Sequence, residues 1–270
     1  IILTNLYIPV TIMLFGLVLR GVAFDFRAKA KVVQRGFWNR AFCFGSFVAS
    51  FSQGYMLGDY ILGFKHSLTA TAFSLLVGSC VTAGYTLVGA CWLIMKTDGE
   101  LQQKSIAWAQ SMLWLACIGI AIVSISTPFV NPRIFEKWFS FPHFFVLLPI
   151  PGFTAILVLA LHLLLRRLPQ PEDHWAWLPF AIVIAIVSLC FYGLAYSFYP
   201  YIVPEQLTIY DAASSTASLK IILVGALIVL PVLLSYTFLI YRIFRGKATV
   251  LSYGEIEGSI PDKSVVPDSA

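Results

Sequence analysis

Seven long stretches of the chain contain no Asp, Glu, Lys or Arg. A helix that crosses the roughly 30 Å hydrocarbon core of a bilayer needs about 20 residues of this kind. The stretches are continuous, whereas a membrane β-barrel shows alternating segments of about 10 residues. They cover residues 1–19, 41–58, 66–95, 105–132, 138–165, 174–204 and 221–241. The pattern predicts an all-α fold, a polytopic transmembrane bundle of about seven helices within residues 1–247.

The composition agrees with this pattern. Of the 270 residues, 59% are hydrophobic and 11% are charged, whereas soluble domains carry about 25% charged residues. Membrane lipid is therefore the expected surrounding, and nucleic acid is not an expected partner. The chain starts at Ile1 inside an apolar stretch without a basic leader, so we expect it to belong to a longer protein rather than to open with a signal peptide.

The basic residues are concentrated on one side of this topology. The segments 20–40, 96–104, 166–173 and 242–270 alternate with the others and hold 14 of the 18 lysine and arginine residues. Loops rich in Lys and Arg face the cytoplasm. We therefore expect a multi-pass protein of the prokaryotic cytoplasmic (inner) membrane, with residues 248–270 forming a disordered cytoplasmic tail.

No catalytic, cofactor-binding or metal-binding residue is predicted. Ionisable groups at the bilayer centre are usually functional, but every charged residue here lies at or beyond the end of a stretch. The four histidines, His66, His143, His162 and His174, all fall near predicted membrane surfaces, so none is placed to share a haem iron with another. The five cysteines lie in apolar stretches without metal spacing and are expected to be buried hydrophobic residues.

Some residues are candidates for packing and capping. Small residues at helical spacing, such as Gly45 with Ala49 and Cys80 with Gly84, permit close helix approach, and Gly45 or Gly84 is expected to meet another membrane subunit. Asp211 is placed to cap the last helix or a turn before it. The alternation of charges and aromatic rings in 131–141 predicts a short interfacial helix. Prolines at 149, 151, 179 and 231 are expected to kink helices.

Four motifs in order carry a family resemblance. They read LRGVAFDFR (19–27) followed by WNRAFCFGSF (38–47), GYTLVGACWLIMKTDGELQ (84–102), YPYIVPEQLTIYDAASS (199–215), and the segment 230–247 ending in FRGK. Together they resemble subunit II of the cytochrome bd-type quinol oxidases, more closely its short, cyanide-insensitive branch, through about residue 247.

The resemblance implies a terminal oxidase that oxidises quinol and reduces oxygen to water. In that family, subunit I carries the haems b and d, and subunit II is a haem-free accessory subunit that packs against it. Some members hold a structural quinone, and whether this chain holds one is left open. The resemblance also implies about two further helices ahead of Ile1, with the acidic residues linked to proton uptake, so no proton-path residue is assigned.

This sequence departs from the family pattern at two positions. Asn39 stands where Asp is expected after Trp38, and Tyr210 stands where Trp is usual before Asp211. Arg20, Asp25 and Arg27 match the family motif. We expect them to form an ion-pair network that braces an interface, as opposed to a positive-inside anchor with an incidental acid.

Two other classes of protein fit the sequence less well. A secondary transporter or permease needs a substrate site near the midplane and usually repeat symmetry, and the sequence shows neither. A haem-bearing cytochrome subunit is disfavoured by the positions of the histidines.

Overall fold

The computed structural model describes residues 2–65, 67–130, 132–141, 145, 147–169, 175–204, 206–244 and 246–247, with the side chains of 130, 132, 133 and 137 left aside. Seven long helices dominate this described part. They are α1 (Ile2–Lys29), α2 (Val32–Ile61), α3 (Leu68–Lys96), α4 (Gly99–Val130), α7 (Pro149–Arg167), α8 (Leu178–Phe198) and α10 (Thr216–Ile243). Two short helices, α5 (Pro132–Phe139) and α9 (Ile209–Ala212), accompany the small strands β1 (Tyr201–Val203) and β2 (Leu207–Thr208). The all-α membrane bundle is confirmed.

Six of the long helices are long and apolar enough to cross a membrane: α1, α3, α4, α7, α8 and α10. The exception is α2, which is 30 residues long but carries Arg35, Arg40 and Asp59 as well as several polar residues. Among the described residues the number of apolar spanning helices is therefore six, and α2 is a more polar seventh helix packed against α1 and α3.

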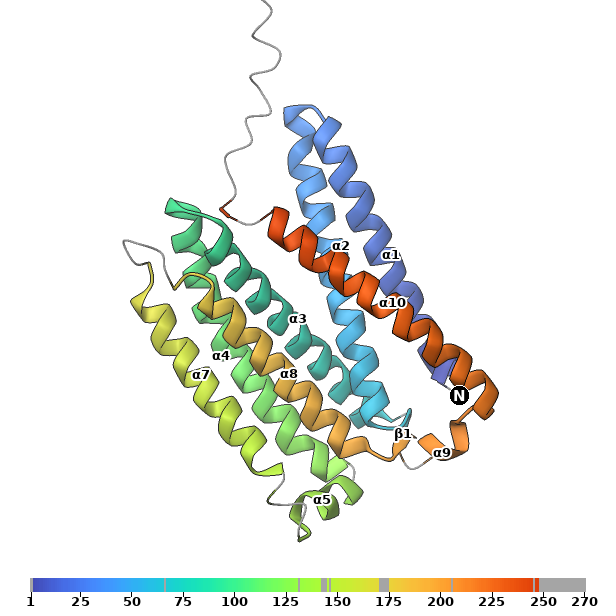
Figure 1. Ribbon diagram of the computed structural model, residues 1–270. Helices are drawn as coiled ribbons and strands as arrows, with labels where there is room; N and C mark the ends of the chain where they lie inside the picture. The colour runs from blue at the N-terminus through green and yellow to red at the C-terminus, as the bar shows by residue number, and fades with distance from the viewer. Residues whose placement is uncertain are drawn as a thin grey trace, which may run out of the picture.

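Four helices form a closed bundle, because α3 packs on α4, α4 on α7, α7 on α8, and α8 back on α3. Its centre is a cluster of buried aliphatic residues. This cluster includes Leu87, Cys91, Ile94, Leu113, Leu161, Leu165 and Val183. The α1–α2 hairpin attaches to the bundle through contacts between α2 and α3. Figure 1 shows the two parts side by side.

The helix ends differ from the predicted loops at two places. Residues 20–40 were expected to be a loop, but α1 continues to Lys29 and α2 begins at Val32, so the connection is two residues. The stretch 138–165 was expected to be one span, but α7 begins only at Pro149. Proline lacks the backbone N–H and fits the first helical turn. Pro149 and Pro179 thus mark helix starts, while Pro231 lies inside α10.

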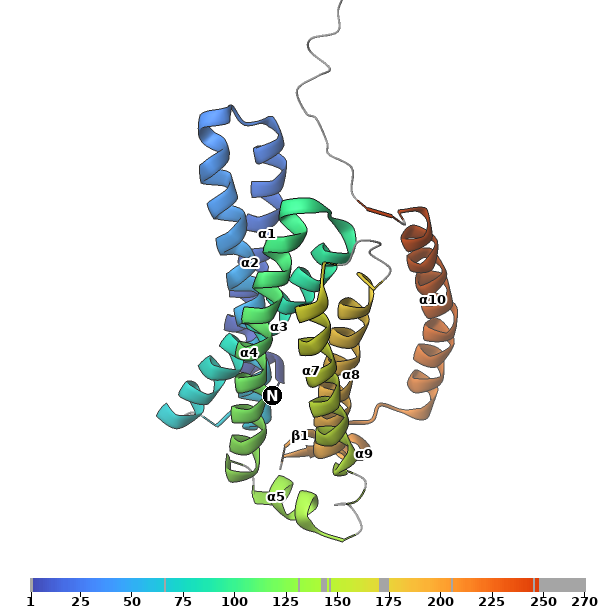
Figure 2. The ribbon, with the colours of Figure 1, turned by 90° about the vertical axis from the view of Figure 1, so that its left-hand side faces the viewer.

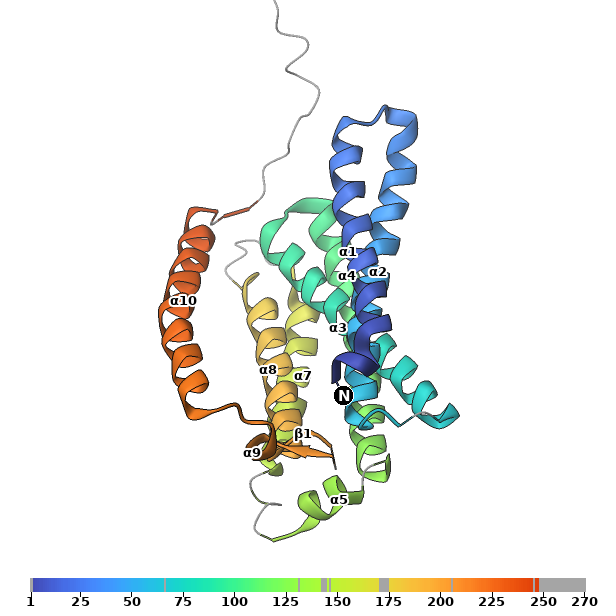
Figure 3. The same cartoon turned by 90° about the vertical axis from the view of Figure 1, so that its right-hand side faces the viewer.

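Helix α10 stands apart from the bundle. No residue within Thr216–Ile243 is buried, and Figures 2 and 3, from opposite sides, both show α10 separated from α7 and α8. The helix is tied to the rest at its two ends. One end follows the β1–β2 hairpin and α9, and the other meets the junction between α3 and α4, where the polar site described next is found.

Candidate functional site: a polar clasp at the basic end

Lys96, the last residue of α3, holds the end of α10. Its ammonium group donates hydrogen bonds to the carbonyl oxygens of Phe244 and Gly246, each at 2.9 Å. The final carbonyl groups of a helix have no partner within the helix and carry partial negative charge. Lys96 therefore caps α10 with a positive charge supplied from a different helix.

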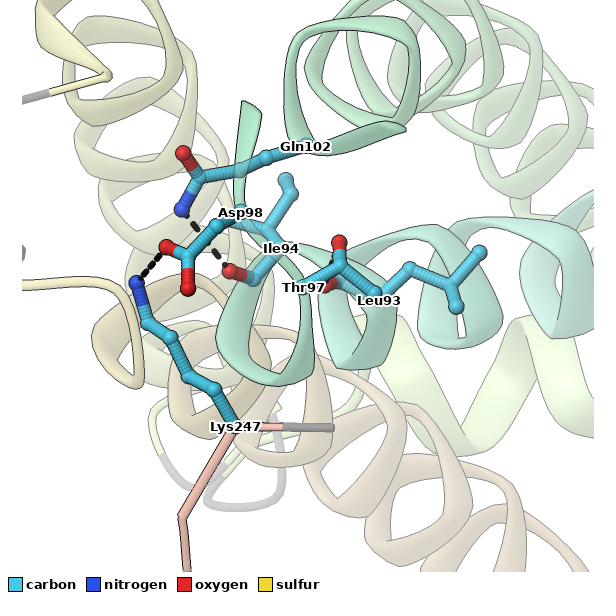
Figure 4. Close-up of polar contacts among 6 residues, drawn as sticks. All are labelled: Leu93, Ile94, Thr97, Asp98, Gln102 and Lys247. Atoms are coloured by element: carbon cyan, nitrogen blue, oxygen red, sulfur yellow. Dashed lines mark hydrogen bonds and ion pairs between the residues drawn. The ribbon is translucent and has the colours of Figure 1, made fainter. Parts of the chain in front are cut away.

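A second contact follows directly. Lys247 forms an ion pair with Asp98, one of the two residues between α3 and α4 (Figure 4). Because the Asp98 side chain is 64% exposed, this pair contributes little by itself, about 0–1 kcal/mol. Lys96, Asp98 and Lys247, with the carbonyl groups of Phe244 and Gly246, are called the clasp below.

The turn that carries Asp98 is shaped by local hydrogen bonds. Thr97 ends α3, with its backbone N–H and its hydroxyl both donating to the carbonyl of Leu93. Gly99 takes a positive φ of 65° to start α4, a conformation that glycine adopts without steric cost. The buried amide of Gln102 donates to the carbonyl of Ile94 at 3.2 Å (Figure 4). These bonds fix Asp98 and Lys96 relative to each other.

Aromatic rings support the clasp from the bundle side. The Lys96 ammonium lies 5.3 Å from the centre of the Trp92 ring, within the range of a cation–π interaction. Trp92 also packs edge-on against Phe180 of α8 and Tyr241 of α10, with ring centres 5.1 and 5.8 Å apart. Trp92 thereby links α3, α8 and α10 in one contact group.

The groups in the clasp are suited to holding two helix ends together. It combines two ammonium groups, one exposed carboxylate and backbone carbonyl groups, and these are groups for hydrogen bonding and charge pairing. Among the described residues, no group of three or more His, Cys, Asp or Glu side chains is arranged to hold a metal ion. The clasp joins the motif at 84–102 to the segment 230–247, two of the motifs that carry the family resemblance.

The two glycines predicted to meet another subunit have different surroundings. A Cβ on Gly45 would lie 2.7 Å from the carbonyl oxygen of Gly16 and 3.0 Å from the amide nitrogen of Arg20. Gly45 therefore serves the crossing of α1 and α2 within this chain, which leaves Gly84 as the more accessible of the two candidates. A Cβ on Gly84 would meet nothing within 4 Å, so its contact with a partner stays a prediction.

Arg20, Asp25 and Arg27 are all exposed on α1. Arg20 places its guanidinium 5.9 Å from the ring centre of Phe42. Within the described part of the chain, these three residues form no ion pair with one another. The reason is the continuous helix: neighbours on a helix surface are three or four residues apart, whereas Arg20 and Asp25 are separated by five and Asp25 and Arg27 by two. Their role at an interface stays a prediction.

Asp211 helps to cap a helix, as the third residue after the N-cap residue Thr208. It forms a capping box with Thr208 at the start of α9: the Thr208 hydroxyl accepts from the Asp211 N–H at 3.2 Å, and the Asp211 carboxylate accepts from the Thr208 N–H at 3.4 Å. The expected turn before the last helix is thus the one that Asp211 caps, while Ser215 caps α10 itself. The nearby Tyr210 hydroxyl lies 3.2 Å from that of Tyr199, and this hydrogen bond raises the pKa of Tyr199.

Of the four histidines, only His162 lies within the described residues. Its ring packs edge-on against Trp114 of α4, with ring centres 5.3 Å apart. The Nδ1 atom is covered by protein and has no hydrogen-bond partner among the described residues, so only Nε2 could face a ligand. The contacts of His162 fit ring packing between α4 and α7. His66, His143 and His174 lie outside the described residues.

A close crossing of α2 and α3 was not predicted. A Cβ on Gly58 would lie 2.6 Å from Ser74 Cα, and a Cβ on Gly54 would lie 2.7 Å from Gly78 Cα. These glycines bring the backbones of α2 and α3 together. The signal was available, because Gly54 and Gly58 form a small-xxx-small pair of the kind that permits close helix approach in membranes.

The fold and the clasp define a multi-pass α-helical membrane protein, with six apolar spans and one more polar long helix in the part of the chain that the structure describes. The chain belongs to the family described as cytochrome bd terminal oxidase subunit II, which matches residues 1–244. It is therefore a subunit of a terminal quinol oxidase, a bacterial respiratory complex, and the permease alternative has no support.

Two relatives show the extent of the similarity. The chain is 26% identical over 290 aligned residues to cytochrome bd-I ubiquinol oxidase subunit 2 of Escherichia coli (strain K12), covering 91% of this chain and 75% of that protein. It is 22% identical over 264 residues to cytochrome bd ubiquinol oxidase subunit 2 of Bacillus subtilis (strain 168), covering 92% of this chain and 75% of that protein.

Proposed function

We propose that this chain is the haem-free, non-catalytic subunit of its oxidase and supports a haem-bearing subunit I that carries haems b and d. The observation that carries the proposal is that the polar groups around the α3–α4 junction hold helix ends together. The Lys96 ammonium binds carbonyl groups just after α10, and Lys247 pairs with Asp98 at the α3–α4 junction. Gln110 of α4 donates to the carbonyl of Leu165 on α7. These contacts fix helix positions, as a supporting subunit requires.

The surroundings of His162 support the haem-free assignment. The His162 ring packs against Trp114 of α4, and His162 lies five residues before the end of α7 at Arg167, near the membrane surface rather than in the middle of the span. The sequence positions of His66, His143 and His174, all near the ends of apolar stretches, point the same way. A structural quinone stays a prediction, since nothing described here forms a recognisable site for it.

We further propose that the basic end faces the cytoplasm, which would put the residues after Lys247 on that side. Lys29, Lys96, Arg166 and Arg242 lie at the ends of four different long helices. Figure 1 shows these helix ends on the same side of the molecule. Clustering of Lys and Arg on one side sets membrane orientation.

The experiment is purification of the complex through an affinity tag on this chain, followed by a visible spectrum. The proposal predicts a second large membrane subunit and haem absorbance that survives replacement of all four histidines of this chain. Loss of a haem on changing His162 alone would contradict it. For orientation, single cysteines at positions 133 and 205 should react with an impermeant reagent from outside, and cysteines at positions 29 and 100 should not.

A further inference from the structure

The short helix α5 presents two kinds of surface. Ile134 and Trp138 face the bundle: Ile134 is 3% exposed, and the Trp138 indole donates to the Ser197 hydroxyl of α8 at 2.9 Å. Phe135 and Phe139 are exposed, with ring centres 4.7 Å apart. Each pair is four residues apart, so each forms one stripe along the helix.

The position of α5 along the membrane normal is fixed by its neighbours. The apolar span of α4 runs to Phe129, and that of α7 begins at Pro149. Helix α5 therefore lies where these two spans leave the hydrocarbon core, at the end of the molecule opposite the clasp, as Figures 1 and 2 show. With eight residues it is only about 12 Å long, too short to span, and it is anchored to α8 by Trp138 and Ile134.

The exposed phenylalanines continue beyond α5 on both sides. Phe141 and Phe145 follow it and pack edge-on with ring centres 5.6 Å apart, and both are more than half exposed. Phe129 ends the apolar span of α4 and is 80% exposed, and Phe153 lies in the first turns of α7, also exposed. The aromatic surface is thus continuous with the apolar sides of two membrane spans, which argues for lipid as its occupant.

We propose that Phe135, Phe139, Phe141 and Phe145 form a lipid-binding surface that holds α5 in the interfacial layer of the bilayer. Amphipathic helices bury their apolar side at the boundary between headgroups and acyl chains. The exposed carboxylate of Glu136 lies about 200° around the helix from Ile134, away from the bundle-facing stripe, so it can remain in water. The surface fixes the depth of the outer end of the α3, α4, α7 and α8 bundle.

Photo-crosslinking in native membranes tests this proposal. The photoreactive residue p-benzoylphenylalanine would replace Phe139, or Phe135 as a second position, in the assembled oxidase. We expect irradiation to raise the mass of this subunit by that of one phospholipid, as measured by intact-protein mass spectrometry, without a crosslinked protein band. The same residue at Phe153, within a membrane span, is the matched control for lipid reactivity. A crosslink from position 139 to another protein would overturn the proposal, as would the absence of a lipid adduct there.

Discussion

Lys96 Nζ lies 2.9 Å from the carbonyl oxygen of Phe244, a residue 148 positions further along the chain. This bond connects the end of α3 to the end of α10, a helix with no buried residue of its own. The position of α10 therefore depends on contacts at its two ends. Lys96, at the α3–α4 junction, therefore helps to position α10.

Lys96→Met should destabilise the assembled complex. The substitution keeps an unbranched side chain of similar length but removes the charge and both hydrogen bonds to the end of α10, a loss of about 1–2 kcal/mol. We expect a thermal midpoint lowered by a few degrees in the purified oxidase. The matched control is Lys104→Met, because the ion pair of Lys104 within the described residues is an exposed one with Glu100 on the same helix, at 3.6 Å. Equal midpoints for the two variants would contradict the role of Lys96.

The pair of Asp98 and Lys247 should contribute much less than Lys96. Double-mutant cycles on exposed ion pairs give coupling energies of about 0–1 kcal/mol, so Asp98→Asn, Lys247→Gln and the double variant should show a coupling in that range. The coupling should shrink further as salt is raised. A coupling well above this range in the intact complex would indicate that the pair is buried there by another subunit.

Gly58→Ala should weaken the α2–α3 crossing. The added Cβ would lie 2.6 Å from Ser74 Cα, so a backbone must shift, and such overpacking costs about 1–3 kcal/mol. The control is Gly89→Ala on α3, where a Cβ meets nothing within 4 Å. Since alanine favours a helix interior over glycine by about 1 kcal/mol, that change should be neutral or slightly stabilising. The yield of monodisperse complex in size-exclusion chromatography measures both.

Gly84→Leu tests the predicted contact with the partner subunit. The site is open in this chain, so the larger side chain should be accommodated by the subunit itself. If Gly84 meets the partner, we expect a several-fold lower yield of the two-subunit complex at unchanged expression of this chain. Gly89→Leu is the control at an equally open position on another side of α3. A normal yield for Gly84→Leu would place the partner elsewhere.

Features with local causes could be predicted from the sequence. The spans α8 and α10 were found because apolar stretches of that length have few other uses in a membrane protein. The part of Asp211 in a helix start was found because Asp commonly accepts from backbone N–H groups there. The short connection from α1 to α2 was missed, since charged residues end an apolar stretch without ending the helix.

Features that depend on distant parts of the chain could not be predicted. Nothing near Lys96 in the sequence indicates that its partners are the carbonyl groups of Phe244 and Gly246. The β1–β2 hairpin was not predicted, because it lies in a segment rich in Pro, Ser and Thr. It is held in part from outside, because the Tyr60 hydroxyl donates to the carbonyl of Ile202 and Gln206 donates to the carbonyl of Gly63 at 2.8 Å. Such contacts follow from the packing of helices and not from local pattern.

Arg20 and Asp25 match the family motif and lie toward the C-terminal end of α1. Arg20 lies over the Phe42 ring and Asp25 is exposed, so a partner for the carboxylate has to come from outside the described part of this chain. We expect Arg20→Ala and Asp25→Ala each to reduce the amount of assembled oxidase, with activity and haem content falling together. Immunoblotting of the complex and its visible spectrum measure the two quantities.

Whether the variants lose assembly or oxygen reduction distinguishes the possible roles of Arg20 and Asp25. If Asp25 meets a cation of the partner subunit, its removal leaves that charge unpaired at a partly dehydrated interface, which costs more than the pair itself contributes. Asp25→Asn keeps the shape but removes the charge and should lose assembly as Asp25→Ala does, whereas Asp25→Glu should retain part of it. Full assembly of Asp25→Ala without oxygen reduction would instead make Asp25 a proton-path residue. Parent-like behaviour of all variants would leave Arg20 and Asp25 as ordinary members of a positive membrane anchor.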